Sequence, residues 1–421
     1  MCFCCCPPAV TALAYLWIRS GFRKDAVAGA LTFFPPDPPL YKFQRIDKDG
    51  KELPDISDDD VDDSDGEEDD ERGEDDSDSE LGVADDAPPS KATTQTSKEK
   101  RAEREQRRRE EANADPIVAM TERSKIQRKR AKRRARTDAA DAKAGVTYRF
   151  IPDTDSLGSL PSFNGSVEAV KIGPQKKTGT YIAALLYRRH AKDDDTKTIV
   201  YSHGNATDVG AMAGLQCLIA KNVNCHVLVY DYSGYGESGG MLGEKMTYRD
   251  IELVFQWTID NVAKHERNIV LYGQSVGSGP SCFLASRKPD LGGLILHSPF
   301  TSGLRVLTPS RVLGCLDIFP NIDRIKKASC KVFIIHGQKD NEVPIEHGLS
   351  LQAAVRDDCK SDPWWVPDKG HNDIVEGPNI VQVGSSSSSP VSLVSSSPSL
   401  TVFLQYINRL NQFMRLLRDE D

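Results

Sequence analysis

Residues 268–287, NIVLYGQSVGSGPSCFLASR, join an apolar run to a glycine-flanked serine and then to a run of small residues. The first part is typical of a buried strand and the last part of a helix. Between them, Gly273-Gln274-Ser275-Val276-Gly277 is a G-x-S-x-G sequence, which in this context places a serine hydroxyl on a sharp turn. Glycine is expected there because a Cβ would clash. We therefore interpret Ser275 as a candidate nucleophile.

Short apolar runs alternate with helical patterns on both sides of this stretch, from about residue 146 to about residue 380. The alternation predicts an α/β fold with a mostly parallel central sheet flanked by helices. An antiparallel pair, SVEAVKI and YIAALLYR, is expected to open the sheet. The parallel strands are expected in TKTIVYSHG, CHVLVYDYSG, NIVLYGQS, LGGLILHS, KVFIIHG and DPWWVPD.

A serine hydroxyl is a weak nucleophile unless a base accepts its proton, and the base must in turn be oriented by a third group. Asp340 follows the predicted strand KVFIIHG, and His371 follows the next strand, in WWVPDKGHND. Both positions lie at carboxyl ends of strands, where open α/β sheets build their sites. The order Ser275, Asp340, His371 therefore predicts a catalytic triad.

Other side chains compete for these roles. Asp368 lies three residues before His371 and could orient it locally, but a carboxylate from a neighbouring loop holds the ring better, so Asp340 is favoured. His297 and His336 also stand at strand ends. We interpret both as side chains that satisfy local hydrogen bonds.

Attack on a carbonyl also requires donors for the developing oxyanion, usually two backbone N–H groups. One donor is expected at Val276, directly after the nucleophile. The other is expected after the strand in TIVYSHGNATD, at the amide of Asn205, with Ala206 as its neighbouring alternative. The sequence has none of the usual metal or nucleotide motifs, so we expect neither a metal nor a cofactor.

The whole 421-residue chain has a formal net charge of -8, and a long segment before the predicted sheet is strongly charged. Residues 55–86 are almost entirely acidic and polar, which predicts disorder. The basic cluster at 125–136 is typical of a nuclear-localisation or nucleic-acid patch, or of a solvated helix that pairs with the acidic segment or a membrane surface. It lacks interleaved aromatic residues, so nucleic acid is not the expected partner.

The N-terminus, MCFCCCPP, carries Cys2, Cys4, Cys5 and Cys6, which could form a metal site, a disulfide knot or attachment points for fatty acid. The spacing is not that of a zinc site. The apolar run at 9–18 is too short to span a bilayer. The remaining cysteines are scattered singly, which is typical of small buried side chains in a reducing compartment.

Several motifs together resemble the alpha/beta-hydrolase domain-containing protein 17 family: SHGNATDVG, YDYSGYGESGG, LYGQSVGSGP, LHSPFTSGLRV, FPNIDRIKK, IIHGQKDNEV and GHNDI. The N-terminus is similar too, with its cysteines, its apolar run and LTFFPPDPPLYKF. The resemblance implies an α/β-hydrolase fold and a membrane-associated serine hydrolase that removes palmitate from cysteines of other proteins. It implies Ser275 as nucleophile, Asp340 as acid and His371 as base. It also implies acylation of Cys2, Cys4, Cys5 and Cys6.

The expected organisation is a membrane-anchoring N-terminus (1–45), a disordered acidic and then basic insertion (46–145), and a hydrolase domain (146–421) with a serine-rich linker at 384–399 and a short cap. The expected location is the cytosolic face of plasma or endosomal membranes, with S-palmitoylated proteins as substrates. Two alternatives stay open: an esterase for lipid or small esters with the same triad, and a non-catalytic adaptor that acts through the charged insertion.

Overall fold

The computed structural model describes residues 32–54, 116–153, 160–190, 196–307, 317–375 and 398–419; at 116–126 and 398–400 it describes the backbone alone. The chain divides into two units. The main unit comprises residues 1–54 and 125–421. The second unit comprises residues 55–124, of which only 116–124, the start of a helix, are described.

Ten strands of the described chain form one sheet in the order β1-β2-β3-β4-β6-β5-β7-β8-β9-β10. The pairs from β1 to β6 are antiparallel, and those from β6 to β10 are parallel. The strands are β1 (Tyr41–Ile46), β2 (Thr147–Pro152), β3 (Gly165–Ile172), β4 (Ile182–Arg189), β5 (Thr198–Ser202), β6 (His226–Tyr230), β7 (Ile269–Gln274), β8 (Gly293–His297), β9 (Val332–Gly337) and β10 (Trp364–Val366).

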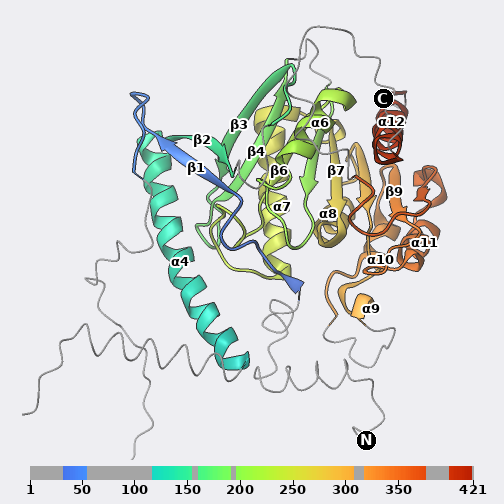
Figure 1. Cartoon of the computed structure of the whole chain (residues 1–421), viewed down its shortest axis with the longest axis horizontal. Helices are drawn as coiled ribbons and strands as arrows, with labels where there is room; N and C mark the ends of the chain where they lie inside the picture. The colour runs from blue at the N-terminus through green and yellow to red at the C-terminus, as the bar shows by residue number, and fades with distance from the viewer. Residues whose placement is uncertain are drawn as a thin grey trace, which may run out of the picture. The chain divides into compact units, whose positions relative to one another are not determined.

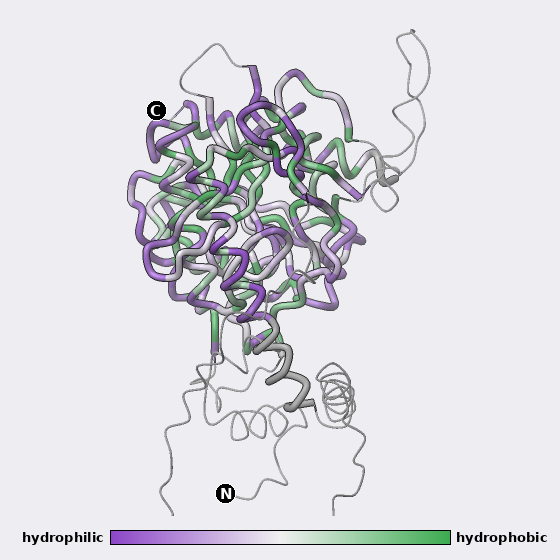
Figure 2. Tube along the Cα trace, turned by 90° about the vertical axis from the view of Figure 1, so that its left-hand side faces the viewer, coloured by the Kyte–Doolittle hydropathy of each residue, from purple (hydrophilic) through white to green (hydrophobic). Residues whose placement is uncertain are grey.

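Helices cover both faces of the sheet (Figure 1). One apolar core includes side chains of α7, α8 and α11, and the other includes side chains of α6 and α12. Apolar segments of the main unit gather in its interior, and hydrophilic segments lie outside (Figure 2). The α-helices are α4 (Pro116–Ala144), α6 (Ala213–Val223), α7 (Glu244–Thr258), α8 (Ser278–Ala285), α9 (Gly303–Leu307), α10 (Asn321–Arg324), α11 (Ile345–Ala354) and α12 (Pro398–Asp419).

The predicted strands are confirmed. β3 and β4 form the expected antiparallel pair, and the six stretches expected as parallel strands are β5 to β10. Strands β5, β6, β8 and β9 are buried at every residue. Continuous apolar runs are what a strand needs when helices cover both of its faces.

The single cysteines of the core are buried as expected, at Cys217, Cys225, Cys282, Cys330 and Cys359. Burial raises the pKa of the Cys225 and Cys282 thiols to about 12. Both thiols therefore stay protonated near neutral pH and act as small apolar side chains.

The domain boundaries expected from the sequence differ from those in the structure at β1 and β2, the strands at one side of the sheet. Strand β1 begins at Tyr41, inside the range 1–45 expected as a membrane anchor, and it pairs with β2 at 147–152. Part of the range 46–145, predicted to be disordered, has secondary structure, because residues 116–144 form α4. The disorder prediction was wrong for this part; the acidic stretch 55–86 lies outside the described residues.

Charged side chains join the carboxyl-terminal half of α4 to other parts of the main unit. Arg134 donates to the carbonyl of Gly236 (2.8 Å) and to the carboxylate of Glu237 (2.9 Å). Lys171 of β3 lies 3.2 Å from Asp138, with both side chains 6% exposed. A buried ion needs such a partner. Part of the basic cluster at 125–136 is therefore used within the fold and is not simply solvated.

Other predictions lie outside the described residues: the cysteine cluster, the apolar run at 9–18, and most of the linker expected at 384–399. The chain between β8 and β9 is short, as expected, and its described parts contain α9, α10 and a single turn at Ile325–Lys327. None of the helices in the described ranges is both long enough and apolar enough to cross a membrane.

Candidate active site

Ser275 stands on a strained turn between β7 and α8. Its φ angle is +51°, in the left-handed region that non-glycine residues rarely adopt. A single 3-10 turn, Ser275–Gly277, links the strand to the helix. A Cβ added to Gly277 would lie 2.0 Å from the Ser202 carbonyl oxygen, and one added to Gly273 would lie 2.6 Å from the Gly277 oxygen. The two glycines let the chain turn tightly against β5.

The Gly277→Ala variant is expected to lose about 3 kcal/mol or more of unfolding free energy, because its Cβ would overlap backbone that cannot move away easily. Urea unfolding followed by circular dichroism measures the change. Gly239→Ala is the matched control, since its Cβ would lie 3.4 Å from the nearest atom, the Thr180 methyl. Equal unfolding midpoints for the two variants would contradict the steric explanation.

The structure brings the three predicted triad residues together. His371 Nε2 lies 2.9 Å from Ser275 Oγ, and His371 Nδ1 lies 2.7 Å from Asp340 Oδ2. Asp340 follows β9 and His371 follows β10, which pair in parallel, so both loops leave the same edge of the sheet. The arrangement can move a proton from the serine hydroxyl to the imidazole while the carboxylate holds the ring.

The loop after β9 holds the Asp340 carboxylate firmly. Its Oδ1 accepts the backbone N–H groups of Val343 (2.7 Å) and Glu342 (3.0 Å). Burial alone would raise the pKa of Asp340, but hydrogen bonds from His336, His371 and the Val343 amide outweigh burial and hold its pKa well below the ordinary value. The carboxylate therefore stays charged beside His371.

The alternative acid, Asp368, is directed elsewhere. Its side chain is 79% exposed and pairs with Lys339 at 2.5 Å. Its φ angle is +60°, a left-handed conformation typical of turns, and it lies three residues before His371. The contact to the imidazole is made by Asp340, in agreement with the choice made from the sequence.

The two competing histidines have local partners. His336 Nε2 lies 2.8 Å from the Val343 carbonyl oxygen, and His297 Nδ1 lies 2.9 Å from the Tyr272 hydroxyl. Burial, followed by the charges of His371 and His336, lowers the pKa of His297 to about 3, so this ring is neutral. His336 also lies 3.3 Å from Asp340 Oδ2. Sequence reasoning missed this second contact, because His336 lies in β9 and Asp340 in the following loop, whose path only the fold reveals.

The predicted oxyanion donors belong to neighbouring segments. Ser202 of β5 pairs with Gly273 of β7, so the chains towards Asn205 and Val276 leave the sheet side by side. The Asn205 side chain is held from two directions: its Oδ1 accepts the backbone N–H of Phe34 (2.9 Å) and the hydroxyl of Tyr235 (2.9 Å). Donation by the two backbone amides to an oxyanion stays a prediction.

Phe34 and Tyr235 were missed as neighbours of the site. Phe34 belongs to LTFFPPDPPLYKF, which the sequence analysis assigned to the anchoring region. Tyr235 lies in YDYSGYGESGG after β6. In the sequence, each is simply an aromatic residue beside a predicted turn. That pattern does not indicate a hydrogen-bond partner far away in the chain.

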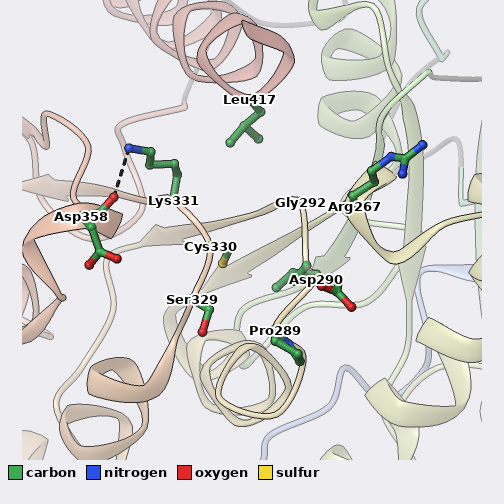
Figure 3. Close-up of a pocket in the computed structure, with 10 residues that line it drawn as sticks. Arg267, Pro289, Asp290, Gly292, Ser329, Cys330, Lys331, Asp358 and Leu417 are labelled. Atoms are coloured by element: carbon green, nitrogen blue, oxygen red, sulfur yellow. Dashed lines mark hydrogen bonds between the residues drawn. The ribbon is translucent and has the colours of Figure 1, made fainter. Parts of the chain in front are cut away.

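A depression of about 390 Å³ lies at the opposite edge of the sheet (Figure 3). Its lining includes Arg267, Gly292 and Lys331, which precede β7, β8 and β9 respectively. The triad residues follow their strands and do not line it. Within the residues that the structure describes, no cluster of His, Cys, Asp or Glu is arranged to hold a metal ion.

Sequence comparisons place the chain in a known family. The family model described as serine aminopeptidase, S33, matches residues 193–364. Human alpha/beta hydrolase domain-containing protein 17B is 42% identical over 197 residues, which cover 47% of this chain and 67% of the human protein. This chain belongs to the alpha/beta-hydrolase domain-containing protein 17 family.

Other relatives extend the comparison. The Caenorhabditis elegans alpha/beta hydrolase domain-containing protein aho-3 is 42% identical over 178 residues, 42% of this chain and 53% of that protein. The chain therefore spans about half to two thirds of these relatives' lengths. Among solved structures, an esterase from Pyrococcus furiosus is 15% identical, covers 61% of this chain and 96% of its own, and has a TM-score of 0.45. The family and the sheet order establish the α/β-hydrolase fold.

Proposed function

We propose that this member of the family is a serine hydrolase that removes palmitate from S-acylated cysteines of membrane-associated proteins. The observation that carries the proposal is the continuous hydrogen-bonded path from Ser275 Oγ through His371 to Asp340. The family resemblance supplies the substrate class. Ester hydrolysis is the broader activity that the same path supports.

The first half of the proposed reaction forms an acyl-enzyme. Ser275 Oγ attacks the thioester carbonyl carbon as His371 Nε2 accepts the hydroxyl proton. The carbonyl oxygen becomes an oxyanion, to which the amides of Val276 and Asn205 would donate. The carbon–sulfur bond then breaks, and the cysteine sulfur leaves with the proton returned by His371. The products are the free protein thiol and a palmitoyl ester of Ser275.

The second half releases the fatty acid. A water molecule attacks the ester carbon and gives a proton to His371, a second oxyanion forms at the same amides, and Ser275 Oγ leaves with that proton. Asp340 stays ionised throughout, in keeping with its lowered pKa, and stabilises the imidazolium in both halves.

Aromatic side chains pack together in the core beside α8. Phe33 packs edge-on against Tyr235 and Phe319, and Phe300 lies 6.1 Å from Phe319 between ring centroids. Phe319 packs against α8, where a Cβ on Gly279 would lie 2.2 Å from its ring. These aromatic side chains are buried and belong to one apolar core.

We also propose attachment to the cytosolic face of plasma or endosomal membranes through acylated Cys2, Cys4, Cys5 and Cys6. One acyl chain binds a membrane only marginally, so several are needed for stable attachment.

The short connection between β8 and β9 supports access by a protein-borne substrate, because no large inserted domain separates the two strands.

The test is release of palmitate from a palmitoylated cysteine peptide by the full-length chain, with lysophospholipid as a competing substrate and phosphonate labelling of the serine as a measure of reactivity. The expected result is release from the peptide together with labelling. Labelling and lysophospholipid hydrolysis without release from the peptide would select the lipid esterase. If the chain showed no labelling and hydrolysed no substrate, the non-catalytic adaptor role would be the remaining candidate.

A further inference from the structure

The segment that leads into β1 and includes its first residue, residues 33–41, lies against the loop that carries the predicted oxyanion donor. We call these residues the strap and residues 203–210 the oxyanion loop. At one end, the Phe34 N–H donates to Asn205 Oδ1 (2.9 Å); at the other, the Leu40 N–H donates to Asp208 Oδ2 (2.8 Å). A Cβ on Gly210 would lie 2.8 Å from the Leu40 carbonyl oxygen. The strap therefore contacts the loop closely near both of the strap's ends.

The first part of the strap is held in place by an aromatic side chain. Phe33 is 4% exposed, and its ring packs edge-on against Tyr235 (6.5 Å between centroids) and Phe319 (6.2 Å). The Tyr235 hydroxyl donates to the same Asn205 oxygen that accepts the Phe34 amide. Two donors from separate parts of the chain thus fix one carboxamide, with Phe33 packed beside one of them.

The last part of the strap is held by a buried carboxylate. The Tyr41 hydroxyl donates to Asp231 Oδ2 (2.5 Å), and Asp231 Oδ1 accepts the Val209 amide (3.0 Å) and lies 3.3 Å from His203 Nε2. Val209 and His203 lie near the two ends of the oxyanion loop. All of Tyr41, Asp231 and His203 are buried. Through Asp231, the strap is linked by hydrogen bonds to Val209 near one end of the loop, and the same carboxylate lies beside His203 at the other end.

We propose that the strap is a positioning element for catalysis: it holds Asn205 so that the backbone amide of this residue faces the oxyanion. The proposal rests on the proposed function, in which that amide stabilises the two tetrahedral intermediates. Removal of one oxyanion donor lowers kcat roughly 10²–10³-fold, and misplacement should cost part of this factor. Phe33 and Tyr235 are positioning residues here, since they act through Asn205.

The test compares kcat and KM for a p-nitrophenyl ester, and the rate of phosphonate labelling, in full-length Phe33→Ala, Tyr235→Phe and the double variant. The expected result is a roughly tenfold or larger fall in kcat and in the labelling rate, with KM and the pH profile unchanged. The double variant should lose less than the product of the single losses, because both residues act on Asn205. Phe33→Leu should restore most of the rate.

Tyr187→Phe is the matched control, because it also removes one buried tyrosine hydrogen bond, to the Ala213 carbonyl (3.1 Å) in the other core. If the Phe33 and Tyr235 variants and this control all have a lowered melting temperature and an unchanged kcat, the positioning role is overturned. A rise in KM alone would overturn it too. If the wild type were labelled by the phosphonate but did not hydrolyse the palmitoyl peptide, the proposed substrate would be rejected. The role of the strap could still be tested through the labelling rates.

Discussion

Ser275→Ala is expected to lower hydrolysis of any ester or thioester substrate by roughly 10⁴–10⁶-fold in kcat, the range found when one member of a catalytic triad is removed. The reason is that, within the described residues, Ser275 is the hydroxyl that lies within hydrogen-bond distance of the His371 imidazole (2.9 Å), whereas the Ser298 hydroxyl reaches only the His371 backbone carbonyl (3.5 Å). The residual rate should come from the oxyanion donors and from binding. The measurement is steady-state hydrolysis of a p-nitrophenyl ester and of the palmitoylated peptide.

Ser286→Ala is the matched control for this loss. Ser286 follows the same helix, α8, and its hydroxyl donates to the Phe283 carbonyl (2.8 Å). It should retain wild-type activity. If Ser275→Ala kept more than about a hundredth of the wild-type rate with an unchanged fold, Ser275 would not be the nucleophile, since triad replacements remove far more than this.

Asp340→Asn is expected to lower kcat by roughly 10⁴-fold, because an amide in place of the carboxylate favours the wrong imidazole tautomer. Asp368→Asn should change kcat less than twofold, since Asp368 is exposed and pairs with Lys339. Both variants remove one negative charge from neighbouring loops, so the comparison isolates the contact with His371. Similar losses in the two variants would show that charge near the site, and not this contact, controls the rate.

The lowered pKa of Asp340 also predicts how stability responds to acid. An unfolded aspartate titrates near pH 3.9, and the folded group titrates lower. The group therefore contributes stability above its unfolded pKa, and this contribution is lost as the pH falls through the folded pKa. Urea unfolding below about pH 4 should show a weaker pH dependence in Asp340→Asn than in the wild type. Equal slopes would mean that the pKa is not lowered.

Strands β3 to β10, the turn at Ser275 and the three side chains proposed as the triad could be predicted from the sequence. These features depend on neighbours in the chain. A continuous apolar run predicts a buried strand, and Gly273 and Gly277 are required by backbone contacts within and beside the turn. Asp340 and His371 could be placed because each directly follows a strand, and parallel strands end at one edge of a sheet.

Tertiary structure alone decided the rest. The pairing of β1 with β2 joins segments about a hundred residues apart, and the Phe34 amide meets Asn205 across 171 positions. The alternation in YKFQRI and TYRFIP could have indicated strands, but not their partner. A hydrogen bond between distant segments leaves no periodic pattern in either one, because its geometry depends on how the intervening chain packs. For this reason residues 33–41 looked like part of an anchor in the sequence and are a strap on the oxyanion loop in the fold.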